Sequence, residues 1–122
     1  MNPELLKVLL VDDEEDYLDI LYERLSLRGF LVETASLPHQ ALELLQKGGY
    51  RAVVLDMMMP GLSGMEALKR IRARHPEIRV ILQTGHATPE TEAKARSLGA
   101  AGLFQKPADL DRLARLIRGE EA

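Results

Sequence analysis

The chain is organised around the stretch Ala52-Val53-Val54-Leu55-Asp56-Met57-Met58-Met59-Pro60-Gly61. This stretch begins as an unbroken apolar run with β-branched valines, which predicts a strand buried on both faces. The run ends at Asp56, and Pro60-Gly61 then indicate a loop. Because open α/β sheets bind ligands at the carboxyl ends of their parallel strands, Asp56 is the first candidate for chemistry.

The composition is that of an ordinary globular domain. With 122 residues, of which 46% are hydrophobic and 29% charged, we expect a single domain over residues 1–122. No apolar run approaches the ~20 residues of a membrane span, and the first four residues lack the basic start of a signal peptide. There is no cysteine for a disulfide or a thiolate zinc site, so we expect a cytoplasmic protein. The formal charge of −3 gives no support for nucleic-acid binding.

Strands and helices alternate on both sides of the central strand. Further strands are predicted at 7–11, 30–34, 79–83 and 101–105, and helices at 13–28, 38–46, 64–74, 89–98 and 109–118. This alternation with short connections predicts an α/β fold, a (βα)5 parallel sheet with helices on both faces. The helix at 89–98 is rich in small residues, so its apolar face is weak and we expect it to shift most easily.

The polar residues at the strand ends predict the order of the strands. The first strand ends in Asp12-Asp13, the third in Asp56, the fourth at Thr84 and the fifth at Lys106, whereas the second ends in nothing reactive. All these ends lie at one edge of a parallel sheet. The doubly wound, flavodoxin-like order 2-1-3-4-5 makes the first and third strands neighbours at the switch point and puts the second at the margin.

Three carboxylates near one point indicate a cation site. Two unit charges about 4 Å apart repel by roughly 1 kcal/mol in water and about 4 kcal/mol at an effective dielectric constant of 20. Either one pKa rises or a cation lies among them. Carboxylate oxygens without His or Cys favour Mg²⁺, Mn²⁺ or Ca²⁺ over zinc. Lys106 and Thr84 add a cation and a hydroxyl suited to phosphoryl oxygens, and a carboxylate placed here can accept a phosphoryl group.

Four segments together resemble the receiver domain of bacterial two-component response regulators. They are Val11-Asp12-Asp13-Glu14, the stretch from Leu55 to Gly61, Thr84-Gly85 and Lys106-Pro107. The resemblance covers the chain from about Lys7 to Arg118. It implies a phosphorelay switch that takes a phosphoryl group from a sensor histidine kinase, a phosphotransfer protein or a small phosphodonor, and that does not turn over an external substrate.

The resemblance also implies a metal set. Asp56 is then the phosphoacceptor, and Mg²⁺, with Mn²⁺ as the alternative, is held by Asp56, Asp12, Asp13 and the backbone carbonyl of Met58. The phosphorylated surface made by the helix at 89–98, the strand at 101–105 and the helix at 109–118 then controls an output domain or a partner protein. A phosphorylation-dependent homodimer is a further expectation of this kind.

The resemblance assigns the remaining roles to three residues. Lys106 contacts the phosphoryl group, Thr84 moves to hydrogen-bond it, and the Lys106–Pro107 peptide is expected to be cis. Receivers usually carry Tyr or Phe three residues before this lysine, where this chain has Leu103. Phe104 comes one place later and should point to the opposite face of the sheet. Our hypothesis is that Leu103 couples to Thr84 by packing.

Each candidate has a plainer alternative. Asp13 could be an N-cap of the following helix, Asp56 a loop aspartate, Lys106 a solvated lysine, and Thr84 part of a turn before Gly85. A Mg²⁺-dependent phosphohydrolase that uses an aspartyl phosphate is the rival function, although no insertion is large enough for a substrate cap. A flavodoxin-like nucleotide binder is disfavoured because no glycine-rich loop follows the first strand.

Other side chains have structural interpretations. Met57-Met58-Met59 are expected to be packing residues, and His39 and His75 exposed residues at helix ends. The cluster Arg70, Arg72 and Arg74 is expected to be a solvated helix face.

His86 lies two residues after Thr84, near the expected rim of the site. Its plain interpretation is a loop residue. The sharper hypothesis is that His86 and Met58 control the access of water to an acyl phosphate. Whether the chain stands alone or belongs to a longer regulator stays open at this point.

Overall fold

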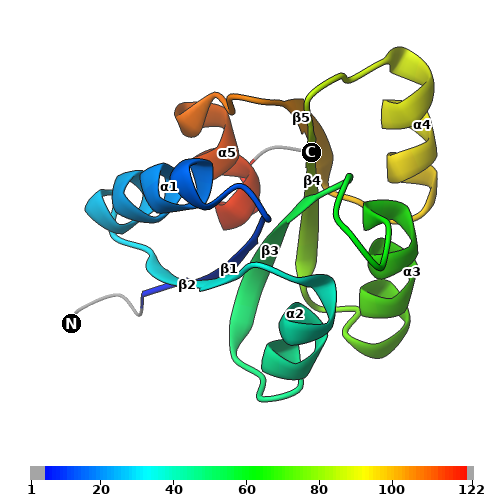
Figure 1. The fold of residues 1–122 in the computed structure, drawn as a ribbon. Helices are drawn as coiled ribbons and strands as arrows, with labels where there is room; N and C mark the ends of the chain where they lie inside the picture. Colours follow the sequence, from blue (N-terminus) through cyan, green and yellow to red (C-terminus); the bar gives the residue numbers. More distant parts are fainter. Residues whose placement is uncertain (1–4, 121–122) are drawn as a thin grey trace.

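Five parallel strands form one sheet in the order β2-β1-β3-β4-β5 (Figure 1). The strands are β1 (Lys7–Val11), β2 (Leu31–Ala35), β3 (Tyr50–Asp56), β4 (Arg79–Thr84) and β5 (Gly102–Gln105). The structure is a computed structural model that describes residues 5–120. The described residues exclude 1–4 and 121–122. The signal-peptide prediction concerns residues 1–4 and therefore lies outside them. The predicted fold class and strand order are confirmed.

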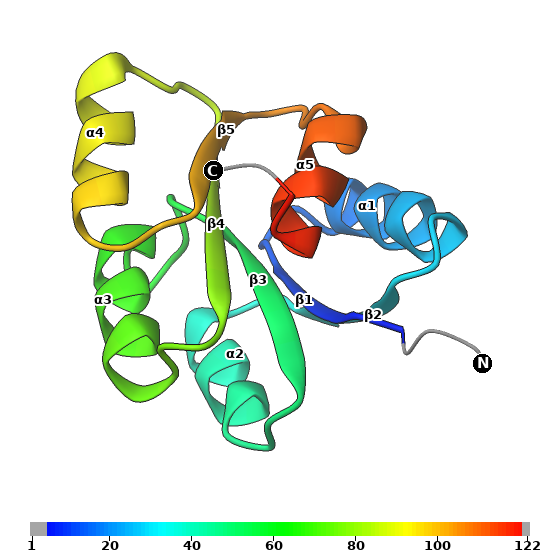
Figure 2. The ribbon, with the colours of Figure 1, turned by 180° about the vertical axis from the view of Figure 1, so that it is seen from behind.

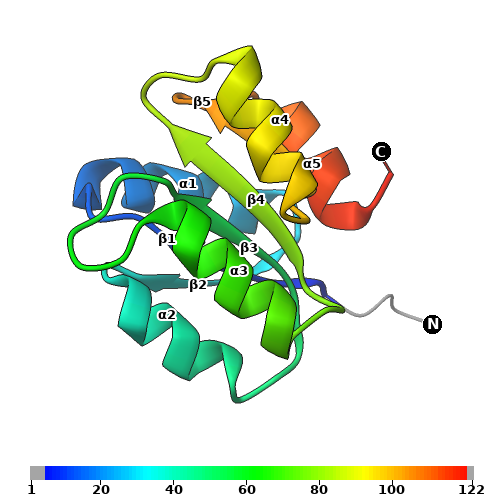
Figure 3. The same ribbon diagram turned by 90° about the vertical axis from the view of Figure 1, so that its right-hand side faces the viewer.

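Five helices cover the sheet in two layers. They are α1 (Glu15–Leu27), α2 (Pro38–Leu45), α3 (Gly64–Arg74), α4 (Pro89–Ser97) and α5 (Leu110–Arg118). One face of the sheet packs on α1 and α5 and the other on α2, α3 and α4, as Figures 2 and 3 show from two sides. Within residues 5–120, no helix combines the length and the apolar character that crossing a membrane requires.

The alternation of side chains along β5 separates two neighbouring residues. Leu103 packs in the core beneath α2, α3 and α4, whereas Phe104 packs in the core beneath α1 and α5. Successive residues of a strand point to opposite faces, so the two side chains lie in different cores. The predicted direction of Phe104 is confirmed.

The start of α1 differs from the prediction. The helix begins at Glu15, two residues later than predicted, and its N-cap is Glu14 in extended backbone conformation. The Glu14 N–H donates instead to Asp12 Oδ1 at 2.9 Å, which closes a turn before the helix. The N-cap alternative for Asp13 is therefore wrong. The start of β3, at Tyr50, is two residues earlier than predicted, and the other bounds agree within one residue.

The helix α4 is held by its cap more than by its packing. Ala95 is its one buried residue. At its start, the Thr88 side chain accepts from the Thr91 N–H, and the Thr91 side chain accepts from the Thr88 N–H. The weak apolar face predicted for this helix is confirmed, and its ability to shift stays a prediction.

The end of α5 is held by two arginines at the starts of β3 and β4. Arg79 Nε donates to the Leu116 carbonyl at 2.7 Å. Arg51 donates from Nε to the Ile117 carbonyl at 2.9 Å and from Nη2 to the Arg118 carbonyl at 2.7 Å. The last carbonyls of a helix have no partner within it, so these bonds fix the C-terminal end of α5 to the sheet.

Candidate functional site

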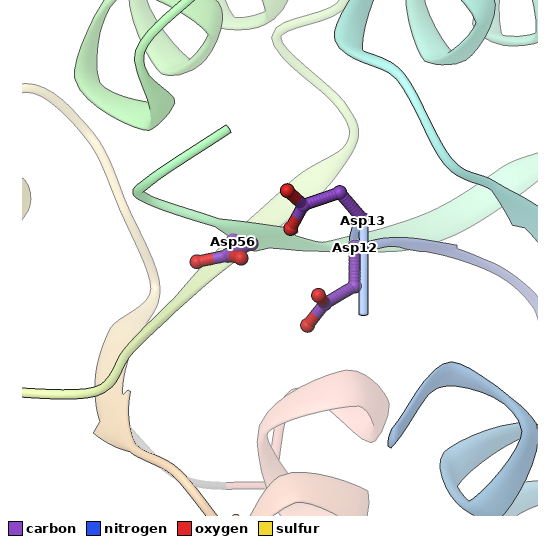
Figure 4. A group of neighbouring side chains, drawn as sticks. All are labelled: Asp12, Asp13 and Asp56. Carbon is purple, nitrogen blue, oxygen red and sulfur yellow. The ribbon is translucent and has the colours of Figure 1, made fainter. Parts of the chain in front are cut away.

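Three carboxylates meet at the carboxyl ends of β1 and β3. Asp12, Asp13 and Asp56 each have an oxygen within 4.8 Å of the oxygens of the other two, and Figure 4 shows them around one space. The cause is the pairing of the two strands, which places Val11 beside Leu55. Asp12 and Asp56 are 3% and 4% exposed, and Asp13 is exposed. The predicted proximity of the three residues is confirmed.

Lys106 brings one positive charge into this acidic cluster. Its Nζ lies 2.8 Å from Asp12 Oδ2, 2.8 Å from Glu14 Oε1 and 3.1 Å from Asp56 Oδ2, and its side chain is 13% exposed. Burial by itself would lower the pKa of Lys106. The three carboxylates outweigh burial and raise that pKa above its ordinary value, so the side chain stays an ammonium. The alternative of a solvated lysine does not fit this position.

Asp56 ionises less readily than an exposed aspartate. Burial raises its pKa, and the nearby charge of Asp12 adds to the effect. The Met58 N–H, which donates to Asp56 Oδ1 at 3.1 Å, and the Lys106 ammonium oppose the rise. The carboxylate is therefore buried and held by two donors, which does not fit the alternative of a loop aspartate.

The donor set fits a divalent cation. Asp12 Oδ2 is buried and, although the Lys106 ammonium lies close to it, accepts no hydrogen bond within the described part of the chain. One ammonium does not balance the negative charges of Asp12, Asp13 and Asp56, and a hard cation among the three carboxylates would neutralise the remainder. Oxygen ligands alone favour Mg²⁺ or Mn²⁺ over zinc.

The loop after β3 departs from the prediction for the methionines. Met59 is buried, but Met58 is 75% exposed, so its interpretation as a packing residue is wrong. The chain leaves the sheet here and returns tightly to α3, with the Gly64 N–H donating to the Met57 carbonyl at 2.9 Å. A Cβ at Gly64 would lie 2.5 Å from Met57 Cα, so glycine is required for this close approach. The turn leaves the Met58 side chain at the rim.

Thr84 lies at the end of β4, as predicted, and is buried, but its hydroxyl bonds within its own loop. Its Oγ1 accepts from the His86 N–H at 3.3 Å and donates to the His86 carbonyl at 3.5 Å. These are the contacts of the turn alternative. The movement of Thr84 toward a phosphoryl group stays a prediction. His86 itself is exposed.

Leu103 shares a sheet face with Thr84 without lying directly beside it. It is 3% exposed and pairs with Leu82, whereas Thr84 pairs with Gln105. Residues two apart on a strand share a face, so Leu103 and Thr84 are diagonal neighbours. This placement is the one that coupling by packing requires.

Two neighbours of Lys106 were not identified from the sequence. Glu14 contacts its ammonium, and the centre of the Tyr17 ring lies 5.0 Å from Nζ. The Tyr17 hydroxyl accepts from the Ala108 N–H at 3.3 Å, beyond the Lys106–Pro107 peptide, which is cis as expected. Burial raises the pKa of Tyr17, so its hydroxyl stays protonated. The signal available in the sequence was their position, one and four residues after Asp13.

Comparison of the chain with known proteins identifies its family. A sequence model of the "response regulator receiver domain" family matches residues 8–118. The chain is 37% identical over 116 residues to a putative NtrX-like response regulator of Rickettsia bellii, covering 93% of this chain and 24% of that protein. It is 33% identical over 112 residues to sporulation initiation phosphotransferase F of Bacillus subtilis, covering 92% of this chain and 90% of that protein.

Solved structures similar to this chain come from the same family. A response regulator receiver domain from Clostridium thermocellum has a TM-score of 0.88 at 32% identity, covering 94% of this chain and 93% of that one. The chemotaxis response regulator CheY4 of Vibrio cholerae has a TM-score of 0.85 at 28% identity, covering 93% and 99%. The chain spans about a quarter of the length of the NtrX-like relatives. It belongs to the receiver domain family of two-component response regulators.

Proposed function

We propose that this chain is a phosphorylation-dependent switch in which Asp56 is the phosphoacceptor. The observation that carries the proposal is the buried Asp56 carboxylate, held between the Lys106 ammonium and the carboxylates of Asp12 and Asp13. A carboxylate oxygen of Asp56 attacks the phosphorus of the donor, the bond from phosphorus to the donor breaks, and an acyl phosphate forms. The single sheet of residues 5–120 supports one receiver domain as the acting unit.

The donor in this proposal is a histidine kinase, a phosphotransfer protein or a small phosphodonor, and the chain turns over no external substrate. The residues that hold Mg²⁺, or Mn²⁺, are Asp12, Asp13, Asp56 and the backbone carbonyl of Met58. When bound, the cation neutralises charge on the carboxylates and on the phosphoryl oxygens. Lys106 then contacts the phosphoryl group. The intact mass of the wild type and of Asp56→Asn after incubation with acetyl phosphate and Mg²⁺ tests Asp56 as the acceptor.

Removal of one metal ligand tests the cation site separately. We expect Mg²⁺ at a hundred times its Kd to raise the free energy of unfolding of the wild type by about 2.7 kcal/mol. Asp13→Asn should lose most of this gain, because it removes one of the proposed anionic ligands. Asp13 is exposed, so its replacement should leave the fold intact. Denaturant unfolding with Mg²⁺ and with EDTA measures both. Asp19→Asn, an exposed aspartate of α1, is the control, and an equal gain in all three proteins would contradict the site.

We further propose that the phosphoryl group draws the Thr84 hydroxyl away from its loop, and that Leu103 passes this change to the surface formed by α4, β5 and α5. The output, whether a further domain, a partner protein or a second copy of the chain, would read this surface. Phosphorylation adds charge and acceptor oxygens at Asp56, which supplies the difference between the two states. The weak packing of α4 supports a small energy gap between them.

Leu103→Ala tests this coupling. With acetyl phosphate and Mg²⁺, we expect the wild type to show NMR shift changes at Thr84 and along α4, and the variant to keep the first and lose most of the second. The variant should also be about 2–5 kcal/mol less stable, as for other Leu→Ala changes in cores. Leu25→Ala, a fully buried leucine of α1 in the opposite core, controls for this loss. Unchanged shifts along α4 in Leu103→Ala would disprove the coupling.

Met58 and His86 are both exposed beside the site, and we propose that they shield the acyl phosphate from water. His86→Ala and Met58→Ala should each hydrolyse the acyl phosphate several-fold faster than the wild type, because water approaches the phosphorus more easily. The decay of phosphorylated protein after removal of the donor gives the rate. His39→Ala, at an exposed helix position, should leave it unchanged. Equal rates in all four proteins would refute the shielding.

A further inference from the structure

A groove runs between α2 and α3, which lie side by side in Figures 1 and 3. It consists of two hollows of about 270 Å³ and about 90 Å³ that share Leu42 and Arg70. Apolar side chains from α2 and from the loop before α3 line the larger hollow, namely Pro38, Leu42, Pro60 and Leu62. We call these two hollows the α2–α3 groove.

The polar side chains that line the groove are cationic or neutral. Arg70 and His39 line the larger hollow, Arg70, Arg74, His75 and Gln46 line the smaller one, and no acidic residue lines either. The chain as a whole carries a formal charge of −3. The groove is therefore a local concentration of positive charge over an apolar floor.

The two groove arginines differ from the other cations of α3. Arg72 Nη1 donates to the carbonyls of Pro76 and Ile78, and Lys69 pairs with Glu66. Arg70 and Arg74 are exposed and make no hydrogen bond or ion pair with any residue between 5 and 120. They lie one helical turn apart, where like charges repel each other. An anionic partner would remove this repulsion.

We propose that the α2–α3 groove binds an acidic amphipathic helix of a partner protein. Large apolar side chains of that helix would fill the hollows over Leu42 and Leu62. Its carboxylates, spaced one turn apart, would pair with Arg70 and Arg74. The 11 residues of α3 span about 16 Å, which accommodates three turns of a partner helix. A nucleic acid would use the arginines but would leave the apolar floor uncovered.

Three designed peptides test the proposal by NMR titration of the whole chain. The first is a helical peptide with Leu along one face and Glu on both flanks, the second replaces every Glu with Lys, and the third has the first composition in scrambled order. Only the first should shift the resonances of Leu42, Leu62 and Arg70. Its Kd should rise about tenfold in the double variant Arg70→Glu, Arg74→Glu, which is about 1.4 kcal/mol, since two ion pairs are lost and like charges take their place.

Arg24→Glu, an exposed arginine on α1, is the matched control and should leave the Kd unchanged. Binding of all three peptides alike, shifts away from the groove, or no shifts would overturn the proposal. So would equal shifts with a DNA duplex, or a change in the oligomeric state of the peptide-free double variant, which would point to a second copy of the chain. The titration is repeated with Asp56→Asn, so that peptide binding at the α2–α3 groove is tested independently of phosphorylation at Asp56.

Discussion

Asp56→Asn is expected to abolish the uptake of a phosphoryl group from acetyl phosphate and Mg²⁺, whereas the wild type gains the mass of one such group. The reason is that the amide of asparagine has the shape of the carboxylate but lacks its anionic oxygen, the nucleophile in the proposed step. Intact mass after incubation measures the uptake. EDTA should prevent it in the wild type as well, because a cation held by the carboxylates would supply the charge neutralisation that the transfer needs.

The control for this experiment is Asp19→Asn, which changes an exposed aspartate on α1 and should gain mass as the wild type does. A gain in Asp56→Asn equal to that of the wild type would disprove Asp56 as the acceptor. No gain in any of the proteins would leave a receiver that accepts only from its kinase or a fold that binds without phosphorylation. Phosphotransfer from a histidine kinase would then distinguish these two.

The stability of the variant shows that a negative result comes from chemistry and not from unfolding. Burial raises the pKa of Asp56 in the folded protein above its unfolded value of about 3.9. Below that unfolded value the side chain is neutral in both states and costs nothing. As the pH rises through the folded pKa, the wild type loses stability because its unfolded state ionises more readily. Asp56→Asn avoids this loss and should be at least as stable as the wild type at pH 7.

Lys106→Met is expected to lower the free energy of unfolding by about 3 kcal/mol at pH 7 in EDTA, as removal of one partner from a buried ion pair does. The variant keeps the apolar stem but leaves the buried carboxylates of Asp12 and Asp56 without a counter-charge. Two consequences follow. The loss should shrink as the pH falls, because protonation removes the negative charges, and it should shrink when Mg²⁺ is added. Urea unfolding at several pH values measures both.

Lys69→Met provides the matched comparison. Lys69 pairs with Glu66 at 3.8 Å, and both side chains are about half exposed. Exposed pairs of this kind contribute less than about 1 kcal/mol, so its removal should change stability little at any pH. A similar small effect for Lys106→Met would mean that solvent, and not the ammonium, compensates the acidic cluster.

The strand order could be predicted because two kinds of local information agree. The buried apolar runs identify the strands, and Asp12, Asp56, Thr84 and Lys106 identify the ends that meet at one edge. The start of α1 could not be predicted in the same way. The Asp12 carboxylate bonds to the Glu14 N–H and so competes with the helix for the backbone. The choice between these two bonds depends on the surroundings of Asp12, which include a lysine 94 positions later in the chain.

The surroundings of Lys106 could not be predicted, because they depend on contacts between residues far apart in the chain. Its contacts with Glu14 and Tyr17 join residues separated by about ninety positions, and no periodic pattern records such a pair. The different directions of the three arginines of α3 could not be predicted either. Spacing alone predicts one solvated face, but Arg72 turns to the carbonyls of Pro76 and Ile78. Only Arg70 and Arg74 remain to line the groove.

The two ends of α5 are held in unequal ways. Its last carbonyls are fixed by Arg51 and Arg79 at the beginnings of the central strands, far along the sheet from Asp56. Its first turn follows Lys106 after a three-residue connection. In this first turn the Asp111 carboxylate accepts from Arg28 Nη1 at 2.7 Å, which joins α5 to α1. Because α5 is bonded to α1 at one end and to β3 and β4 at the other, we expect a displacement of Lys106 to move the helix together with its neighbours and not by itself.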